Sequence, residues 1–172
     1  MRQENVTDVV MEVSSHSLDL HRVDGIAYDV AVFTNLTQDH LDYHKTMEQY
    51  QKAKSLLFAR SKKSVINLDD AAGPYMMECA AGEVMTYAIM QHADLKAEEI
   101  AISANGTAFT LVFQGTRFPV KLHTPGRFSV YNALGAIGAC LCLGIPMECI
   151  LVGLEKNTGV AGRFQVIRSK KG

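Results

Sequence analysis

The C-x-x-C pairs that zinc sites commonly use are missing from this sequence, although it contains four cysteines. These are Cys79, Cys140, Cys142 and Cys149. Three of the four lie in apolar stretches with helical periodicity. We therefore expect thiols packed in the core of a protein from a reducing compartment, and no zinc site.

The sequence also lacks a surplus of charge of either sign. Its 17 Lys and Arg residues and 18 Asp and Glu residues leave a formal net charge of −1, and 48% of all residues are hydrophobic. This balance is typical of a soluble globular protein and gives no indication of binding to nucleic acid or to an anionic membrane. We expect neither of these partners, and no obligatory protein partner.

Long apolar segments are absent as well. The longest apolar run, residues 133–145, contains glycines and is too short to cross a bilayer, and no signal peptide opens the sequence. We therefore expect a cytoplasmic protein. With 172 residues, the chain has the length of one ordinary domain with a substantial core.

The first half of the chain alternates between apolar runs and amphipathic stretches. The apolar runs have the composition of strands covered on both faces, and they occupy residues 7–13, 29–36, 63–68 and 83–89. Helical stretches separate the last three of them, at residues 46–60 and 71–81. This alternation predicts an α/β fold with a mostly parallel, doubly wound, Rossmann-like sheet, in which ligands bind at the carboxyl ends of the strands.

The second half of the chain changes to a strict alternation of apolar and polar side chains. Three such stretches occupy residues 98–103, 106–114 and 116–123. An Asn-Gly dipeptide between the first two is a strong hairpin signal, so these stretches predict a small antiparallel β section. Two predicted helices follow, at residues 129–143 and 147–156.

One lysine lies in an unexpected place in the helix predicted at residues 46–60. The apolar face of this helix is formed by Met47, Tyr50, Leu57 and Phe58. Lys54 falls in the middle of that face. Because burying an ammonium group is costly, Lys54 either extends its amine to water or loses its charge. A neutral amine can react with carbon dioxide to form a carbamate, which would turn the lysine into a carboxylate-like metal ligand.

Polar side chains gather where the first two predicted strands end. Glu12 lies near the end of the first strand, and Asn35 and His40 lie at or just past the end of the second. If these strands are neighbours, Glu12, His40 and Lys54 converge on one site about 10 Å across. Taken singly, Glu12 could point outward at a sheet edge and His40 could cap a loop. Taken together, a Glu, a His and a carbamate would suit Mg²⁺, which leaves its other positions to water and phosphate oxygens.

Five stretches of the sequence resemble the central domain of the Mur ligases. They read "MEVSSH", "VFTNLTQDHLDYH", "MEQYQKAKSLLF", "PGRFSVYNALGAIGACLCLGI" and "GVAGRF", and the resemblance extends over essentially the whole chain. The most similar branch of the family uses ATP to add a third amino acid, meso-diaminopimelate or L-lysine, to UDP-N-acetylmuramoyl-L-alanyl-D-glutamate in peptidoglycan synthesis. The resemblance implies this activity, an acyl-phosphate intermediate, and a requirement for ATP and Mg²⁺.

The resemblance also implies roles for individual residues. Glu12 and His40 would be magnesium ligands, and Lys54 would be a carbamylated lysine that contacts the same metal as His40. Asn132 and Arg163 would lie near the nucleotide.

Two further residues would hold the UDP-muramoyl dipeptide. These are Ser14 and Arg22, which follow the first predicted strand. Leu20 departs from the family pattern, because relatives can carry a glutamine there, and one substrate hydrogen bond would then be lost.

The phosphate-binding loop of the family is missing from this sequence. No G-x-x-x-x-G-K-[ST] pattern occurs in the 172 residues, and nothing in them resembles the N-terminal uridine-binding domain or the C-terminal domain. We therefore expect one partial central domain that is inactive by itself. Its parts would be a parallel section without the loop (1–90), an antiparallel section (91–125) and a helical section that leads to the C-terminal domain (126–172).

Two other interpretations stay open. Folylpolyglutamate synthetase has the same fold and a similar ATP-driven amide ligation, although "EVSSH" followed by Arg22 favours the muramoyl substrate. A non-catalytic binding domain that kept the fold and lost the loop is the other.

Overall fold

A single six-stranded sheet forms the centre of the molecule. The computed structural model describes residues 5–37 and 41–159. The strands lie side by side in the order of the chain: β1 (Tyr28–Phe33), β2 (Ser61–Asn67), β3 (Glu83–Ala88), β4 (Leu95–Ser103), β5 (Gly106–Phe113) and β6 (Thr116–Leu122). The first four are parallel to one another, and β5 and β6 are antiparallel to their neighbours.

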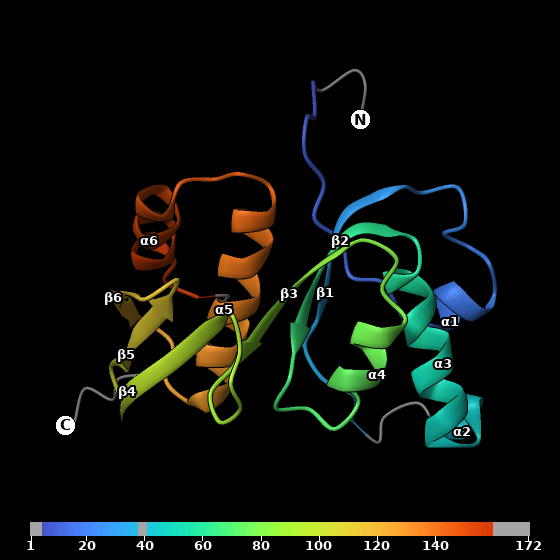
Figure 1. Ribbon diagram of the computed structural model, residues 1–172, viewed down its shortest axis with the longest axis horizontal. Coiled ribbons are helices and arrows are strands. Elements are labelled where there is room, and N and C mark those ends of the chain that lie inside the picture. Colours follow the sequence, from blue (N-terminus) through green and yellow to red (C-terminus); the bar gives the residue numbers. More distant parts are fainter. Residues whose placement is uncertain (1–4, 38–40, 160–172) are drawn as a thin grey trace, which may run out of the picture.

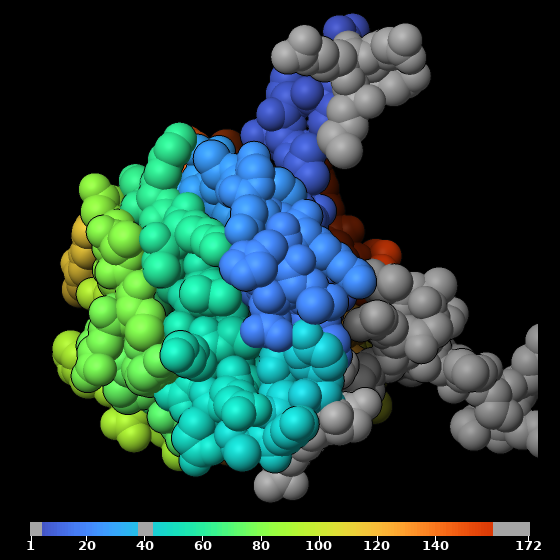
Figure 2. Space-filling view, turned by 90° about the vertical axis from the view of Figure 1, so that its right-hand side faces the viewer, coloured from blue at the N-terminus to red at the C-terminus, as the bar shows by residue number. Residues whose placement is uncertain are grey.

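Helices cover both faces of this sheet, which gives three layers (Figure 1). One layer contains α1 (Ser15–Asp19), α2 (Leu41–His44), α3 (Met47–Phe58) and α4 (Gly73–Glu78), and Figure 2 looks onto it. The other contains α5 (Arg127–Cys142) and α6 (Met147–Lys156). The sheet predicted from residues 29–36, 63–68 and 83–89, and the helices between them, are therefore confirmed. None of the helices in the described ranges is long and apolar enough to cross a membrane.

The main core lies between the sheet and α5. Val65, Leu134 and Ile137 are completely buried there. Gly138 lets α5 approach the sheet closely, because a Cβ atom at this position would come within 2.6 Å of Val65 Cγ1. The sequence "NALGAIGA" thus combines large apolar side chains with small residues on the face that packs against the strands.

The strand predicted at residues 7–13 does not form. This segment has no regular secondary structure, and Val9 and Val10 are 60% and 102% exposed. It runs away from the body of the molecule at the upper edge of Figure 1. A strand needs a hydrogen-bonded neighbour and cover on its apolar faces. Within the described ranges β1 pairs only with β2, and nothing covers the segment, so an apolar composition alone does not make it a strand.

The predicted antiparallel section is confirmed, and it continues the same sheet as the parallel strands. β4 pairs in parallel with the end of β3, through Tyr87↔Leu95 and Ala88↔Lys96, before it pairs with β5. Only residues 89–94 connect these two parallel strands, where a helix is the usual connection. This short loop needs local support, which comes from an aspartate after β2.

A residue with a strained backbone joins α2 to α3. Lys45 has a φ of 61°, in the left-handed region that side chains disfavour. We expect Lys45→Gly to raise the free energy of unfolding by about 0.5–1 kcal/mol, because glycine adopts this conformation without the steric cost. Urea denaturation measures the change. Lys52→Gly, in the regular part of α3, is the matched control and should lower stability by about 1 kcal/mol. Equal destabilisation by both would contradict the argument.

Candidate functional site at the carboxyl ends of the parallel strands

Lys54 turns its amine toward the carboxyl end of β1. Its Nζ atom donates a hydrogen bond of 3.4 Å to the carbonyl oxygen of Asn35, two residues after this strand. The same atom lies 5.6 Å from the centre of the Tyr50 ring, which is one turn earlier in α3. The side chain is half-buried. The amine therefore lies against the protein, at the sheet edge where the sequence predicted a site.

The surroundings of Lys54 disfavour its charged form. Burial lowers the pKa of Lys54, and the negative charges of Asp70 and Glu12 oppose this shift without cancelling it. A lysine with a lowered pKa spends more time as the neutral amine, which is the form that reacts with carbon dioxide.

A cavity of about 250 Å³ lies next to the same stretch of backbone. Three parts of the chain line it: the residues after β1, the end of β2 with the residues that follow it, and the first turns of α5. Most of the lining residues carry a polar group, among them Asn35, Asn67, Asp69, Asp70, Tyr131 and Asn132. Asn35 therefore serves both features, since it borders the cavity and its carbonyl oxygen binds Lys54.

Asp69 lines this cavity and binds the loop that follows β3. Its carboxylate accepts hydrogen bonds from the backbone N–H groups of Ile89, Met90 and Gln91, at 2.6 to 2.9 Å, and from the hydroxyl of Tyr131 at 2.9 Å. Burial raises the pKa of Asp69, but the hydrogen bonds outweigh it, so that the pKa stays below its ordinary value. Burial together with the hydrogen bond to Asp69 raises the pKa of Tyr131 to about 12. Asp69 is thus an acceptor and Tyr131 a donor at neutral pH.

Asp70 and Asn67 also line the cavity. Asp70 accepts hydrogen bonds from the backbone N–H groups of Leu36 and Ala72, at 3.0 and 2.9 Å. Asn67, which is buried, donates to the carbonyl oxygen of Thr34 at 2.8 Å. These contacts fix the backbone on both sides of Asn35, and so fix the carbonyl oxygen that receives the Lys54 amine.

The sequence analysis did not identify Asn67, Asp69, Asp70 or Tyr131 as site residues. A signal was present, because "NLDD" puts an amide and two carboxylates directly at the end of a buried strand of a parallel sheet. Tyr131 carried no comparable signal, since a tyrosine on an apolar helix is typical of a core residue.

Ser14 and Arg22 lie at the two ends of the α1 region. Ser14 is the N-cap of α1, and its Oγ atom accepts a hydrogen bond from the backbone N–H of Ser17 at 3.1 Å. Arg22 is exposed, just beyond the end of α1. Leu20, at the position where relatives can carry a glutamine, is 45% exposed and offers no polar group. Both predicted substrate-binding residues are therefore accessible to a ligand.

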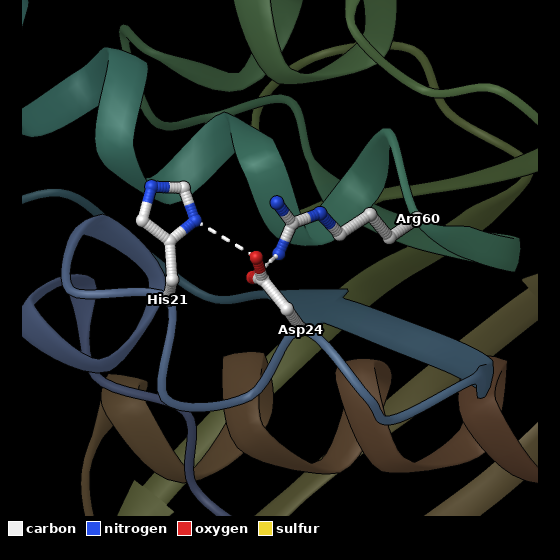
Figure 3. Close-up of polar contacts among 3 residues, drawn as sticks. All are labelled: His21, Asp24 and Arg60. Carbon is white, nitrogen blue, oxygen red and sulfur yellow. Dashed lines mark hydrogen bonds and ion pairs between the residues drawn. The ribbon is translucent and has the colours of Figure 1, made fainter.

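An ionic cluster fastens the loop that follows Arg22 to the end of α3 (Figure 3). His21 Nδ1 lies 2.8 Å from the Asp24 carboxylate, which also forms an ion pair with Arg60. Hydrogen bonds from His21 and Arg60 hold the pKa of Asp24 below its ordinary value. The backbone on both sides of Arg22 is thereby tied to the turn that follows α3, the helix that carries Lys54.

Only part of the predicted metal site lies within the described residues. The predicted metal ligand His40 lies outside them, as does Arg163, which was predicted to lie near the nucleotide. Glu12 is exposed in the segment before α1. Within the described ranges, no group of three His, Cys, Asp or Glu side chains gathers in a way that could hold a metal ion. The carboxylate of Glu12 nevertheless suits Mg²⁺ chemically, because this ion commonly uses one or two protein carboxylates and takes phosphate oxygens and waters as its other ligands.

Comparison with known proteins adds three findings. A sequence family described as "Mur ligase middle domain" matches residues 1–140. A UDP-N-acetylmuramoyl-L-alanyl-D-glutamate--2,6-diaminopimelate ligase of Clostridium acetobutylicum is 48% identical over 167 residues, which are 97% of this chain and 35% of that protein. A solved structure of a ligase with the same designation superposes with a TM-score of 0.89 at 35% identity, over 97% of this chain and 36% of the other.

The fold is shared more widely. MurF ligase from Thermotoga maritima, solved in complex with ADP, superposes with a TM-score of 0.74 at 20% identity over 87% of this chain and 35% of that one. This likeness shows the common fold. The chain spans about a third of the length of the curated relatives it matches.

Proposed function

Because the chain belongs to the Mur ligase family, we propose that it is the central part of a ligase that adds 2,6-diaminopimelate to UDP-N-acetylmuramoyl-L-alanyl-D-glutamate at the expense of ATP. The observation that carries this proposal is the position of Lys54. Its amine has a lowered pKa and faces the carbonyl oxygen of Asn35, which also borders the cavity that contains Asn132. The designation of the similar Clostridium ligase supports diaminopimelate over L-lysine as the added amino acid.

Different residues of the chain would bind the two substrates, the UDP-muramoyl dipeptide and the nucleotide. Arg22 is an exposed guanidinium group suited to a carboxylate or phosphate of the UDP-muramoyl dipeptide, and Ser14 supplies a hydroxyl at the start of α1. Asn132 presents an amide at the cavity, where it can donate to and accept from a nucleotide. Arg163 would complete the nucleotide site.

Lys54, Glu12 and His40 are the residues that would hold magnesium. Carbamylation converts the Lys54 amine into a group with two oxygen atoms and a negative charge. Because the Lys54 amine lies beside Asn35, these oxygens would lie at the same sheet edge. Bound magnesium would neutralise the charge that spreads over the phosphoryl oxygens during transfer.

The reaction has two chemical steps. The substrate carboxylate attacks the γ-phosphorus of ATP, forming an acyl phosphate and releasing ADP. The amine of diaminopimelate then attacks the acyl carbon, phosphate leaves, and an amide bond remains. In this reaction the chain would orient the dipeptide through Ser14 and Arg22, and it would hold the Lys54 side chain in place.

The experiment that tests the proposal uses the full-length protein that contains this chain. Purified protein is incubated with UDP-N-acetylmuramoyl-L-alanyl-D-glutamate, ATP, Mg²⁺ and either meso-diaminopimelate or L-lysine, and products are identified by mass spectrometry. We expect the tripeptide product with diaminopimelate and ADP in equal amount. Product with L-lysine alone would refute the choice of amino acid, and the absence of both products would refute the ligase.

The 172-residue chain by itself is expected to give no ligation. Its sequence contains no glycine-rich loop with G-K-[ST] to surround the β- and γ-phosphates with backbone N–H groups. ADP release in the same assay measures this directly, with the full-length protein as the positive control. Turnover by a fragment preparation shown to be free of full-length enzyme would contradict this prediction.

A further inference from the structure

A histidine outside the predicted site residues lies at the junction of α1, α2 and α3. His44, the last residue of α2, is 4% exposed. Its Nε2 atom forms a hydrogen bond of 2.8 Å with the Oγ atom of Ser15, the first residue of α1, which is equally buried. An imidazole is costly to bury without such a partner, so this hydrogen bond ties the two helices at a defined point.

The other side of His44 rests on α3. Its ring stacks on the ring of Tyr50, with centroids 5.1 Å apart and planes 12° from parallel, and the Tyr43 ring meets it edge-on at 4.7 Å. Tyr50 is itself 4% exposed, and the Lys54 amine lies over its ring. His44 therefore contacts the residue that supports Lys54.

The backbone after His44 keeps the ring in this position. Lys45 takes the strained left-handed conformation, and the N–H of Thr46 donates a hydrogen bond of 2.7 Å to the carbonyl oxygen of His44. A strained residue persists only where its surroundings fix the local conformation, and such residues are common at functional sites. The sharp turn directs His44 inward, between Ser15 and Tyr50.

We propose that His44 is a positioning residue that fixes the substrate-binding start of α1 relative to Lys54 on α3. Ser15 follows Ser14 directly, so the hydrogen bond from His44 holds the residue next to a proposed substrate contact. Through Tyr50 the same ring supports Lys54. The inference rests on the proposed ligase function and adds a residue to it that does not touch substrate or metal. A misplacement of about 1 Å between reacting groups costs on the order of 10²-fold in rate, so a support of this kind has a measurable effect.

Two single variants remove the hydrogen bond and keep the fold. His44→Phe retains the ring that stacks on Tyr50, and Ser15→Ala removes the partner hydroxyl. In the full-length protein we expect each to lower kcat about 10-fold while the KM for ATP stays within about twofold of wild type. Because both variants break the same contact, the double variant should be no slower than either single one. His123→Phe, far from α1 on the β6–α5 connection, is the matched control and should leave kcat unchanged.

The outcomes separate this inference from the proposed function. Wild-type enzyme that ligates diaminopimelate together with variants within twofold of its kcat would overturn the role of His44 and leave the ligase intact. Additive losses, or losses that follow a fall in the thermal midpoint and raise the KM for ATP, would assign His44 a merely structural role and also overturn the inference. A wild-type protein without ligase activity would overturn the proposed function itself, and the inference with it.

Discussion

Lys54→Arg in the full-length protein is expected to lower the rate of ligation by about 10²–10³-fold. Arginine keeps the positive charge and can still donate to the carbonyl oxygen of Asn35, so the local fold survives. A guanidinium group does not lose its proton in proteins and cannot form a carbamate. The negatively charged oxygens that would hold magnesium beside the phosphoryl group are then replaced by a fixed cation.

Lys52→Arg provides the control for this substitution. Lys52 lies two residues earlier in α3 and is exposed, so the same chemical change there should alter kcat by less than a factor of two. Initial rates of ADP release at saturating substrates give the comparison, and thermal midpoints show whether either variant is unfolded. A Lys54→Arg enzyme with wild-type kcat would exclude any carbamate-dependent role for this residue.

Asp69→Asn is expected to cost about 3 kcal/mol of unfolding free energy, the largest stability effect predicted for a single polar substitution in this chain. The carboxylate accepts four hydrogen bonds, three of them from the backbone of the loop between β3 and β4. Three of these bonds end on Oδ2 and one, from Gln91, ends on Oδ1. An asparagine keeps one acceptor oxygen but turns its N–H₂ group toward the N–H of Gln91, which is left unpaired, and it removes the charge that strengthens the other three bonds. Asp29→Asn, which removes an exposed ion pair with Lys62, should cost less than about 1 kcal/mol.

The same aspartate gives the stability a pH dependence of defined sign. Its pKa in the folded chain is lower than the value of about 3.9 in an unfolded chain, so the unfolded state binds a proton first as the pH falls. The stabilisation is therefore fully present above about pH 4 and is lost as the pH falls through the folded pKa. Denaturation curves between pH 3 and pH 7 should converge for wild type and Asp69→Asn at the acidic end. Parallel curves over this range would contradict the assignment.

Sequence reasoning located most helices and strands because their signals are local. The start of α3 follows from Thr46, whose side chain accepts a hydrogen bond from the N–H of Gln49, and the helix predicted at residues 147–156 coincides with α6. Lys54 stood out because a charged side chain interrupted an apolar face. These are properties of a few consecutive residues and do not depend on the rest of the fold.

The features that sequence reasoning missed depend on distant partners. Residues 7–13 have the composition of a covered strand, but a ladder and a cover come from other segments. The parallel pairing of β3 with β4 depends on Asp69, which is 20 to 22 residues away from the loop it holds. His44 is one of several polar residues after the second predicted strand, and only its contacts with Ser15 and Tyr50 distinguish it.

Neighbouring strands in the sheet are always consecutive in the chain, which has a consequence for the order of folding. Each strand meets its partner as soon as the next one is available, so most backbone pairing closes short loops and the sheet can grow from β1 toward β6 during synthesis. Helix α5 does not follow this order, because it comes after all six strands in the chain and yet packs against β1, β2, β3, β4 and β5, whose common face it covers. Burial of this face must wait until α5 has left the ribosome, and α5 ends at Cys142, 20 residues after the end of β6 at Leu122. Until then the growing sheet exposes Val65 and Leu95 to the cell, and this interval is when the chain has most need of a chaperone.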